Sequence, residues 1–92
     1  MNEDDPVDLP IEDAIDLHPF RPRDIPDVVD SYIEAAIEAG FGEVRIIHGR
    51  GIGFQRDRVQ KMLAKDARVL KFYDAPSERG GWGATVAHLK LR

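Results

Sequence analysis

Asp16-Leu17-His18 is the first of two short segments whose residue types could perform acid–base or phosphate chemistry, and it ends an apolar run. Residues two apart in a β-strand project to the same side, so the Asp16 and His18 side chains would share a face, about 7 Å apart by strand rise. A carboxylate beside a histidine can orient the imidazole ring, and the pair can then act as a general acid or base. The alternative is a strand-terminal histidine that bonds only to nearby backbone.

The second segment, His48-Gly49-Arg50-Gly51-Ile52-Gly53, links an apolar run to a basic amphipathic stretch. Glycines at 49, 51 and 53 let backbone N–H groups approach an anion closely, and a helix that follows presents further N–H groups at its positive end. Arg50 adds a planar, permanently charged fork that fits phosphate oxygens, and His48 is a candidate second proton-transfer group. The spacing matches neither a Walker loop nor a dinucleotide fingerprint. We interpret the segment as a phosphate site; a plain glycine-rich turn with an exposed arginine is the alternative.

The only tryptophan, Trp82, lies among glycines in Gly80-Gly81-Trp82-Gly83. Its indole could stack on a nucleic-acid base, or it could cap the edge of the hydrophobic core. The sequence leaves these two roles open.

Hydrophobic periodicity predicts the elements that position these segments. Alternation predicts strands, and apolar spacing of three and four predicts helices. The predicted strands cover 14–18, 43–48, 68–73 and 83–91; the predicted helices cover 24–40, with Asp24 as N-cap, and 54–65. The order βαβαββ implies parallel strands joined by right-handed crossovers, with an antiparallel final strand after a short connection. We therefore expect an α+β, two-layer sandwich with a four-stranded mixed sheet and both helices on one face.

Strand alternation also predicts which residues each face of the sheet carries. The helix-covered face would hold Ile15, Leu17, Leu70 and Phe72; the open face would hold Asp16, His18, Lys71 and Tyr73, joined by His88 and Lys90. A register error of one residue would invert this assignment.

Composition places limits on the chemistry of the 92-residue chain. It contains no cysteine, which excludes disulfides, zinc–thiolate sites and cysteine nucleophiles. The acidic N-terminus does not resemble a signal peptide, and no apolar run is long enough to cross a bilayer, so we expect a cytoplasmic protein without a membrane partner. Size and composition predict one folded domain over residues 13–92, preceded by an acidic arm over residues 1–12. We expect it to be a monomer.

The charge is distributed unevenly along the chain. The formal net charge is −4, but seven acidic residues lie within residues 1–16. Residues 50–71 carry seven basic residues, among them Arg56 and Arg58, against two acidic ones. One edge of the domain should therefore be electropositive, which favours a nucleic-acid partner.

Taken together, the three motifs resemble the Smr (small MutS-related) domain family. The family's Leu-Asp-Leu-His-Gly signature corresponds to residues 15–19, its His-Gly-Arg/Lys-Gly signature to residues 48–51, and its Gly-Gly-x-Gly segment to residues 80–83. The Phe20-Arg21-Pro22 stretch is similar to that of short, stand-alone bacterial members. The resemblance implies a fold like the C-terminal domain of translation initiation factor three, nucleic-acid binding and, in many members, endonuclease activity on DNA or RNA. Pro19 departs from the pattern, because the family has glycine there.

Two functions remain open from the sequence. In an endonuclease, Asp16 and His18 would form the acid–base pair, Arg50 would stabilise the transition state, and His48 would be a second proton-transfer group. The alternative is a non-catalytic nucleic-acid-binding module, which the missing amide at Pro19 and the acidic overall charge favour. We expect neither a metal nor a cofactor, and a ribosome or a repair complex is a candidate larger assembly. The predicted nucleic-acid contacts are Gly49, Arg50, Gly51, Gly53, Arg56, Arg58, Gly81 and Trp82.

Overall fold

The computed structural model describes residues 11–51 and 53–92. Its strands are β1 (Ala14–Asp16), β2 (Glu43–Ile47), β3 (Val69–Asp74) and β4 (Ala84–Leu89), and its helices are α1 (Ile25–Glu38) and α2 (Phe54–Lys65). Three short 3₁₀ turns complete the chain: η1 (Pro22–Asp24), η2 (Ser77–Arg79) and η3 (Gly81–Gly83). No helix of the described residues is long and apolar enough to cross a membrane.

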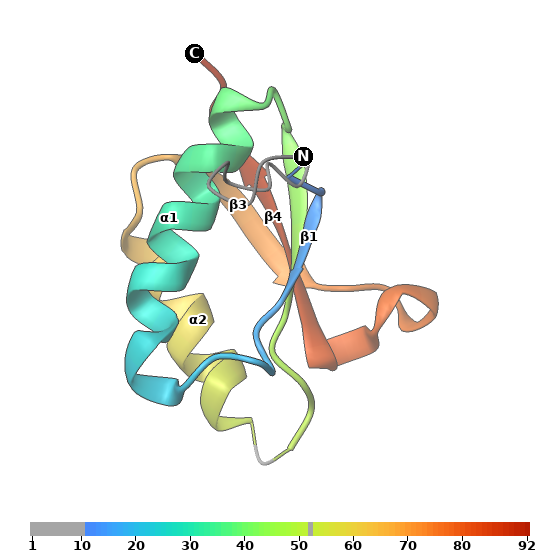
Figure 1. The fold of residues 1–92 in the computed structure, drawn as a ribbon. Helices are drawn as coiled ribbons and strands as arrows, with labels where there is room; N and C mark the ends of the chain where they lie inside the picture. Colours follow the sequence, from blue (N-terminus) through green and yellow to red (C-terminus); the bar gives the residue numbers. More distant parts are fainter. Residues whose placement is uncertain (1–10, 52) are drawn as a thin grey trace, which may run out of the picture.

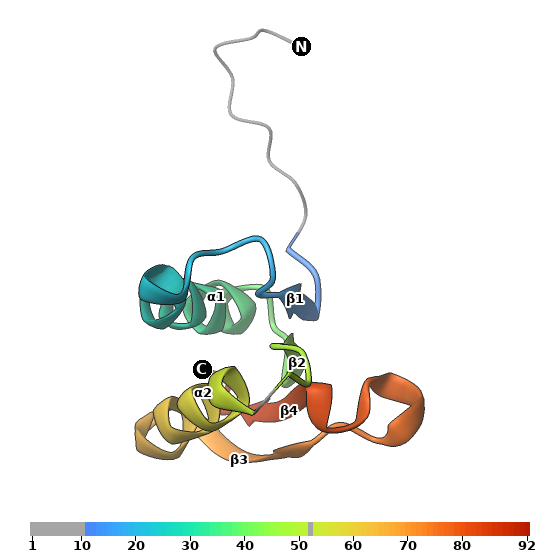
Figure 2. The same ribbon diagram turned by 90° about the horizontal axis from the view of Figure 1, so that it is seen from below.

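The four strands form one mixed sheet in the order β1-β2-β4-β3. β1 and β2 are parallel, and β4 runs antiparallel to both of its neighbours, β2 and β3. Figures 1 and 2 show α1 and α2 side by side on the same face of this sheet. The predicted two-layer α+β sandwich with the βαβαββ order is therefore confirmed.

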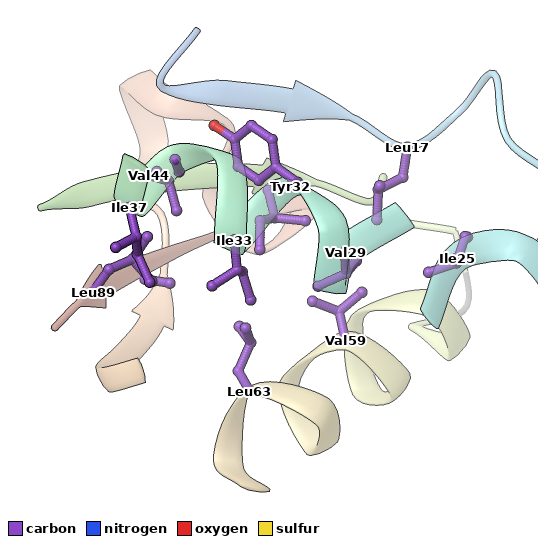
Figure 3. Close-up of a cluster of buried hydrophobic side chains, with 13 residues drawn as sticks. Leu17, Ile25, Val29, Tyr32, Ile33, Ile37, Val44, Val59, Leu63 and Leu89 are labelled. Carbon is purple, nitrogen blue, oxygen red and sulfur yellow. The ribbon is translucent and has the colours of Figure 1, made fainter. Parts of the chain in front are cut away.

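The core lies between the sheet and the two helices (Figure 3). The apolar positions of α1 recur at intervals of three and four, so they form one stripe that faces the sheet: Ile25, Val29, Tyr32, Ile33, Ala36 and Ile37 are all buried. α2 contributes Val59 and Leu63, and the strands contribute residues such as Val44 and Leu89. Ile11 also packs against this core and the Glu12 carbonyl accepts a hydrogen bond from the Tyr32 hydroxyl, while residues 1–10 of the predicted arm lie outside the described residues.

The assignment of Leu70 to the helix-covered face is wrong because β3 contains a bulge. The pairing of β3 with β4 shifts by one residue between Val69 and Lys71. Leu70 therefore has no partner residue in the ladder and is 66% exposed, while Val69 packs against the core in its place. Beyond the bulge the prediction holds: Phe72 packs against the core, and the Tyr73 hydroxyl lies 2.9 Å from His88 Nε2 on the open face.

Other boundaries differ from the prediction in ways that matter for the site. Asp24 is the residue before α1, but its side chain makes no capping hydrogen bond, because η1 runs directly into the helix. Lys90 lies beyond the end of β4. β1 and β2 end at Asp16 and Ile47, so His18 and His48 lie in the loops beyond the strands and not within them as predicted.

Candidate functional site

The first two motifs meet because β1 and β2 are parallel neighbours that end at the same edge of the sheet. Asp16 is paired with Ile47, and the Leu17 N–H donates to the Ile47 carbonyl at 2.9 Å. The loops that leave these two strands must therefore start side by side. Such a carboxyl edge of parallel strands is a common position for ligand sites in α/β sheets.

Asp16 holds the His18 ring in one orientation. Its Oδ1 accepts the backbone N–H of His18 at 2.9 Å and lies 2.5 Å from His18 Nδ1. These two hydrogen bonds, first from the backbone and then from the ring, lower the pKa of the Asp16 carboxyl. A carboxylate only accepts, so Nδ1 carries the proton, and Nε2 is left for a ligand. The His18 side chain is 62% exposed, which leaves it accessible.

The His18 ring lies directly over the backbone of Gly49. A Cβ atom at residue 49 would be 2.7 Å from His18 Nε2, so the ring would have to shift to admit a side chain there. Gly49 also has a φ of +85°, a conformation that glycine adopts without strain. Both the backbone conformation and the position of His18 therefore favour glycine at residue 49.

The third motif completes the site through backbone hydrogen bonds and close packing. The N–H groups of His48 and Gly49 both donate to the Gly83 carbonyl, at 3.1 and 2.8 Å. Arg50 crosses the same turn: a Cβ atom at Gly83 would be 3.0 Å from Arg50 Cγ, and one at Gly81 would be 3.1 Å from Arg50 Nη2. These glycines therefore make room for the arginine. Arg50 is exposed and forms no ion pair with any described residue.

These residues surround an open cleft of about 280 Å³. Its lining comprises His18, His48, Gly49, Arg50, Gly51, Gly53, Phe54 and Gln55. α2 begins at this cleft, after Gly53 with a φ of +84°. An oriented imidazole, a guanidinium and a helix N-terminus together favour an anionic ligand such as a phosphate group.

His48 is buried beside the cleft in a hydrogen-bond network. Its Nδ1 lies 3.0 Å from the Gly49 carbonyl, and its Nε2 lies 2.8 Å from Thr85 Oγ1. Gln60 Nε2 donates to Thr85 Oγ1 at 3.1 Å and to Asp74 Oδ1 at 3.0 Å. Burial lowers the pKa of His48 and so favours the neutral ring. A neutral ring fits both contacts, with Nδ1–H donating to the Gly49 carbonyl and Nε2 accepting the threonine hydroxyl. Both nitrogens are therefore used to hold the loop.

The two predicted arginines of α2 have partners within the protein. Arg56 forms a paired interaction with Asp74, with Nε–Oδ1 and Nη2–Oδ2 distances of 2.9 Å, and its guanidinium lies 5.8 Å from the centre of the Trp82 ring. Arg58 Nη1 donates to the Pro22 carbonyl at 2.5 Å. Trp82 is 43% exposed, and its ring lies close to Gly53 at the rim of the cleft.

Sequence reasoning missed several residues of the site. Phe54 lines the cleft and is 61% exposed. The sequence could have indicated it, because it is an aromatic residue outside the apolar stripe of α2. Gln55 also lines the cleft, and its buried Oε1 has no hydrogen-bond partner among the described residues. Thr85, Gln60 and Asp74 come from three different elements, and nothing in their spacing indicates that they meet. Within residues 11–51 and 53–92, no three His, Asp or Glu side chains lie close enough together to hold a metal ion.

Comparison with known proteins agrees with this arrangement. The Smr domain profile matches residues 15–90. Endonuclease MutS2 of Pediococcus pentosaceus is 39% identical over 80 residues, which are 87% of this chain and 10% of that protein. Endonuclease MutS2 of Gemmatimonas aurantiaca is 41% identical over 75 residues, or 82% of this chain and 9% of that protein. The chain thus spans about a tenth of the curated relatives it matches.

Two crystal structures share the fold. The Smr domain of Thermus thermophilus MutS2 superposes with a TM-score of 0.79 at 35% identity, covering 84% of this chain and 96% of that one. YdaL, a stand-alone small MutS-related protein from Escherichia coli, superposes with a TM-score of 0.80 at 26% identity, covering 88% and 66%. The chain therefore belongs to the Smr domain family.

Proposed function

We propose that this domain binds RNA or DNA at the cleft and cleaves a phosphodiester bond there. The observation that carries the proposal is the contact of the Asp16–His18 pair with Gly49, immediately beside Arg50. An oriented imidazole and a guanidinium without a carboxylate partner among the described residues suit a reacting phosphate. The MutS2 relatives that are named endonucleases support the same activity.

The geometry gives each group a role. His18 Nε2 removes the proton from the attacking hydroxyl, which is the 2′-OH in RNA or a water molecule. Asp16 keeps the proton on Nδ1 and stabilises the imidazolium that forms. Arg50 stabilises the charge that develops on the phosphate oxygens. As the new bond to phosphorus forms, the bond from phosphorus to the leaving-group oxygen breaks. The leaving oxygen takes a proton from water in the open cleft, and the His18 imidazolium returns its proton to the solvent.

His48 has a different role in this proposal. The sequence predicted proton transfer, and that stays a prediction, but both ring nitrogens are occupied in the structure. We assign His48 to holding the Gly49 carbonyl, and with it the backbone on which His18 rests.

A non-catalytic binding module was favoured by Pro19, which lacks the amide that glycine would offer. In the structure Pro19 is exposed and is not one of the residues that line the cleft. The loss of that amide therefore does not remove a donor from the cleft, and this observation favours the catalytic function.

The test is incubation of the purified domain with end-labelled RNA and DNA, with EDTA or with Mg²⁺. His18→Ala should lower the cleavage rate by at least about 10²-fold, as expected for a lost general base. Asp16→Asn should lower it with little change in shape, and His88→Ala, on the open face, is the matched histidine control. Cleavage should survive EDTA, and a single 2′-deoxy nucleotide at the cut site should block it if the 2′-OH attacks.

Three results would contradict this proposal. Full activity of the His18→Ala variant would place the site elsewhere. Activity lost in EDTA and restored by Mg²⁺ would exclude the metal-free mechanism. Salt-sensitive binding without cleavage of either nucleic acid would establish the binding module instead.

A further inference from the structure

A second hollow adjoins the phosphate cleft at His18. Its volume is also about 280 Å³, and its lining is Leu17, His18, Phe20, Pro22, Ile25, His48 and Gln55. The two hollows share three lining residues, His18, His48 and Gln55, so they are contiguous. His18 therefore lines both the phosphate cleft and the second hollow, which we call the apolar hollow because Leu17, Phe20, Pro22 and Ile25 form the rest of its wall beside His48 and Gln55.

The apolar hollow has a preformed wall. Leu17 and Ile25 are buried and form its inner side, whereas Phe20 and Pro22 are exposed. The loop that carries the exposed pair is fixed at both ends, because the Phe20 N–H donates to the Leu17 carbonyl at 3.1 Å and Arg58 donates to the Pro22 carbonyl. An exposed aromatic ring on a fixed loop offers a surface on which a flat ligand can stack without ordering the loop first.

The polar residues of this hollow are His18, His48 and Gln55, and all three also line the phosphate cleft. The remaining lining residues are apolar. A ligand that fills the hollow therefore packs its flat apolar faces against Phe20 and its neighbours and has its polar end beside the phosphate cleft.

We infer that the apolar hollow is a nucleobase subsite, in which a base stacks on Phe20 while the adjoining phosphate lies beside His18 and Arg50. This inference rests on the function proposed above and narrows its substrate. The hollow is slightly smaller than the ~300 Å³ at which pockets for drug-sized ligands begin, so its size suits one nucleoside. A base can enter only after it leaves the duplex stack, so the substrate is a single-stranded region.

The experiment is an NMR titration of the ¹⁵N-labelled domain with the four 5′-mononucleotides and with ribose 5-phosphate, which lacks the base. The nucleotides should bind about tenfold more tightly than ribose 5-phosphate, because one stacked base is added. Phe20→Leu keeps an apolar side chain without the aromatic face, and should remove that difference while ribose 5-phosphate still binds. Leu70→Ala removes an exposed apolar side chain of β3 and should match the wild type.

The outcomes separate this inference from the proposed function. Equal affinities for ribose 5-phosphate and the nucleotides, or a tenfold difference that survives Phe20→Leu, would overturn the nucleobase subsite and leave the phosphate site standing. Failure of every probe to bind, together with failure of single-stranded RNA, would overturn both. If a 20-nucleotide duplex bound more tightly than its single strand, that result would contradict the claim that the substrate is single-stranded.

Discussion

Replacement of Gly49 by alanine should disable the site while leaving the fold intact. The new Cβ atom would lie 2.7 Å from His18 Nε2, whereas non-bonded heavy atoms settle at about 3.5–4.0 Å. The ring must therefore move by about 1 Å, and a displacement of that size can lower a reaction rate by about 10²-fold. Because the His18 side chain is 62% exposed, it can swing away without deforming the core.

Gly40 provides a matched control for the backbone contribution. Its φ is +84°, against +85° for Gly49, but a Cβ atom at residue 40 would meet nothing within 4 Å. Alanine at either position should lower the free energy of unfolding by about 1–2 kcal/mol, the cost of the left-handed conformation for a residue with a Cβ. The two variants should thus have similar stability and differ only at the site.

Three measurements compare the Gly49→Ala and Gly40→Ala variants: urea unfolding, the single-turnover rate of RNA cleavage, and the ring ¹⁵N spectrum of His18. Only Gly49→Ala should lose the hydrogen-bonded Nδ1 signal and about 10²-fold in rate. A Gly49→Ala variant that cleaves as fast as Gly40→Ala would refute the claim that the position of His18 over Gly49 matters. An unchanged His18 spectrum would show that the ring does not need to move.

Three further predictions concern the buried network and the charged edge. Because burial lowers the pKa of His48, the unfolded chain binds a proton that the folded chain does not as the pH falls below about 6.5, so the free energy of unfolding should decrease from pH 7 to pH 5. Urea titrations of a His48→Gln variant should show a flatter profile, and an identical slope would contradict this. Thr85→Val leaves His48 Nε2 without a donor and should cost about 1–3 kcal/mol in urea unfolding; a loss under about 0.5 kcal/mol would show that the bond is dispensable. Arg50→Ala should reduce the slope of log K against log salt for RNA binding by about 0.7, the value expected for the loss of one phosphate contact. Lys65→Ala should leave the slope unchanged, because Lys65 lies about 16 Å from the first residue of α2, at the end of the helix away from the cleft. Equal effects of the two substitutions would argue against a contact localised at Arg50.

The fold was predictable because hydrophobic periodicity is local information. The stripe of α1 and the alternation in the strands identify each element, and the handedness of crossovers leaves few arrangements for the order βαβαββ. The bulge at Leu70 was not predictable in this way. An alternating pattern assumes regular pairing, and the extra residue is revealed only by the partner strand, in which Leu89 faces Val69 and His88 faces Lys71.

The candidate site was predictable to the extent that its residues are close in sequence. Asp16 and His18 are two residues apart, and their pairing follows from that spacing with little help from the rest of the fold. By contrast, the network from His48 through Thr85 and Gln60 joins the loop after β2, strand β4 and helix α2. Taken singly, each of these residues resembles any other polar residue of a helix, strand or loop, so only the three-dimensional structure shows that they form one network.

The glycines show why a motif can be recognised correctly and explained incompletely. From the sequence, glycines beside an arginine indicated backbone N–H groups turned toward an anion. In the structure the N–H of Gly49 donates to the Gly83 carbonyl, and the missing side chains of Gly49 and Gly83 leave space for His18 and Arg50. The three motifs occur together because each supplies the space or the hydrogen bond that another needs. A change at one glycine should therefore act through the side chain that rests on it, and the effect should be largest at Gly49, where the contact is closest.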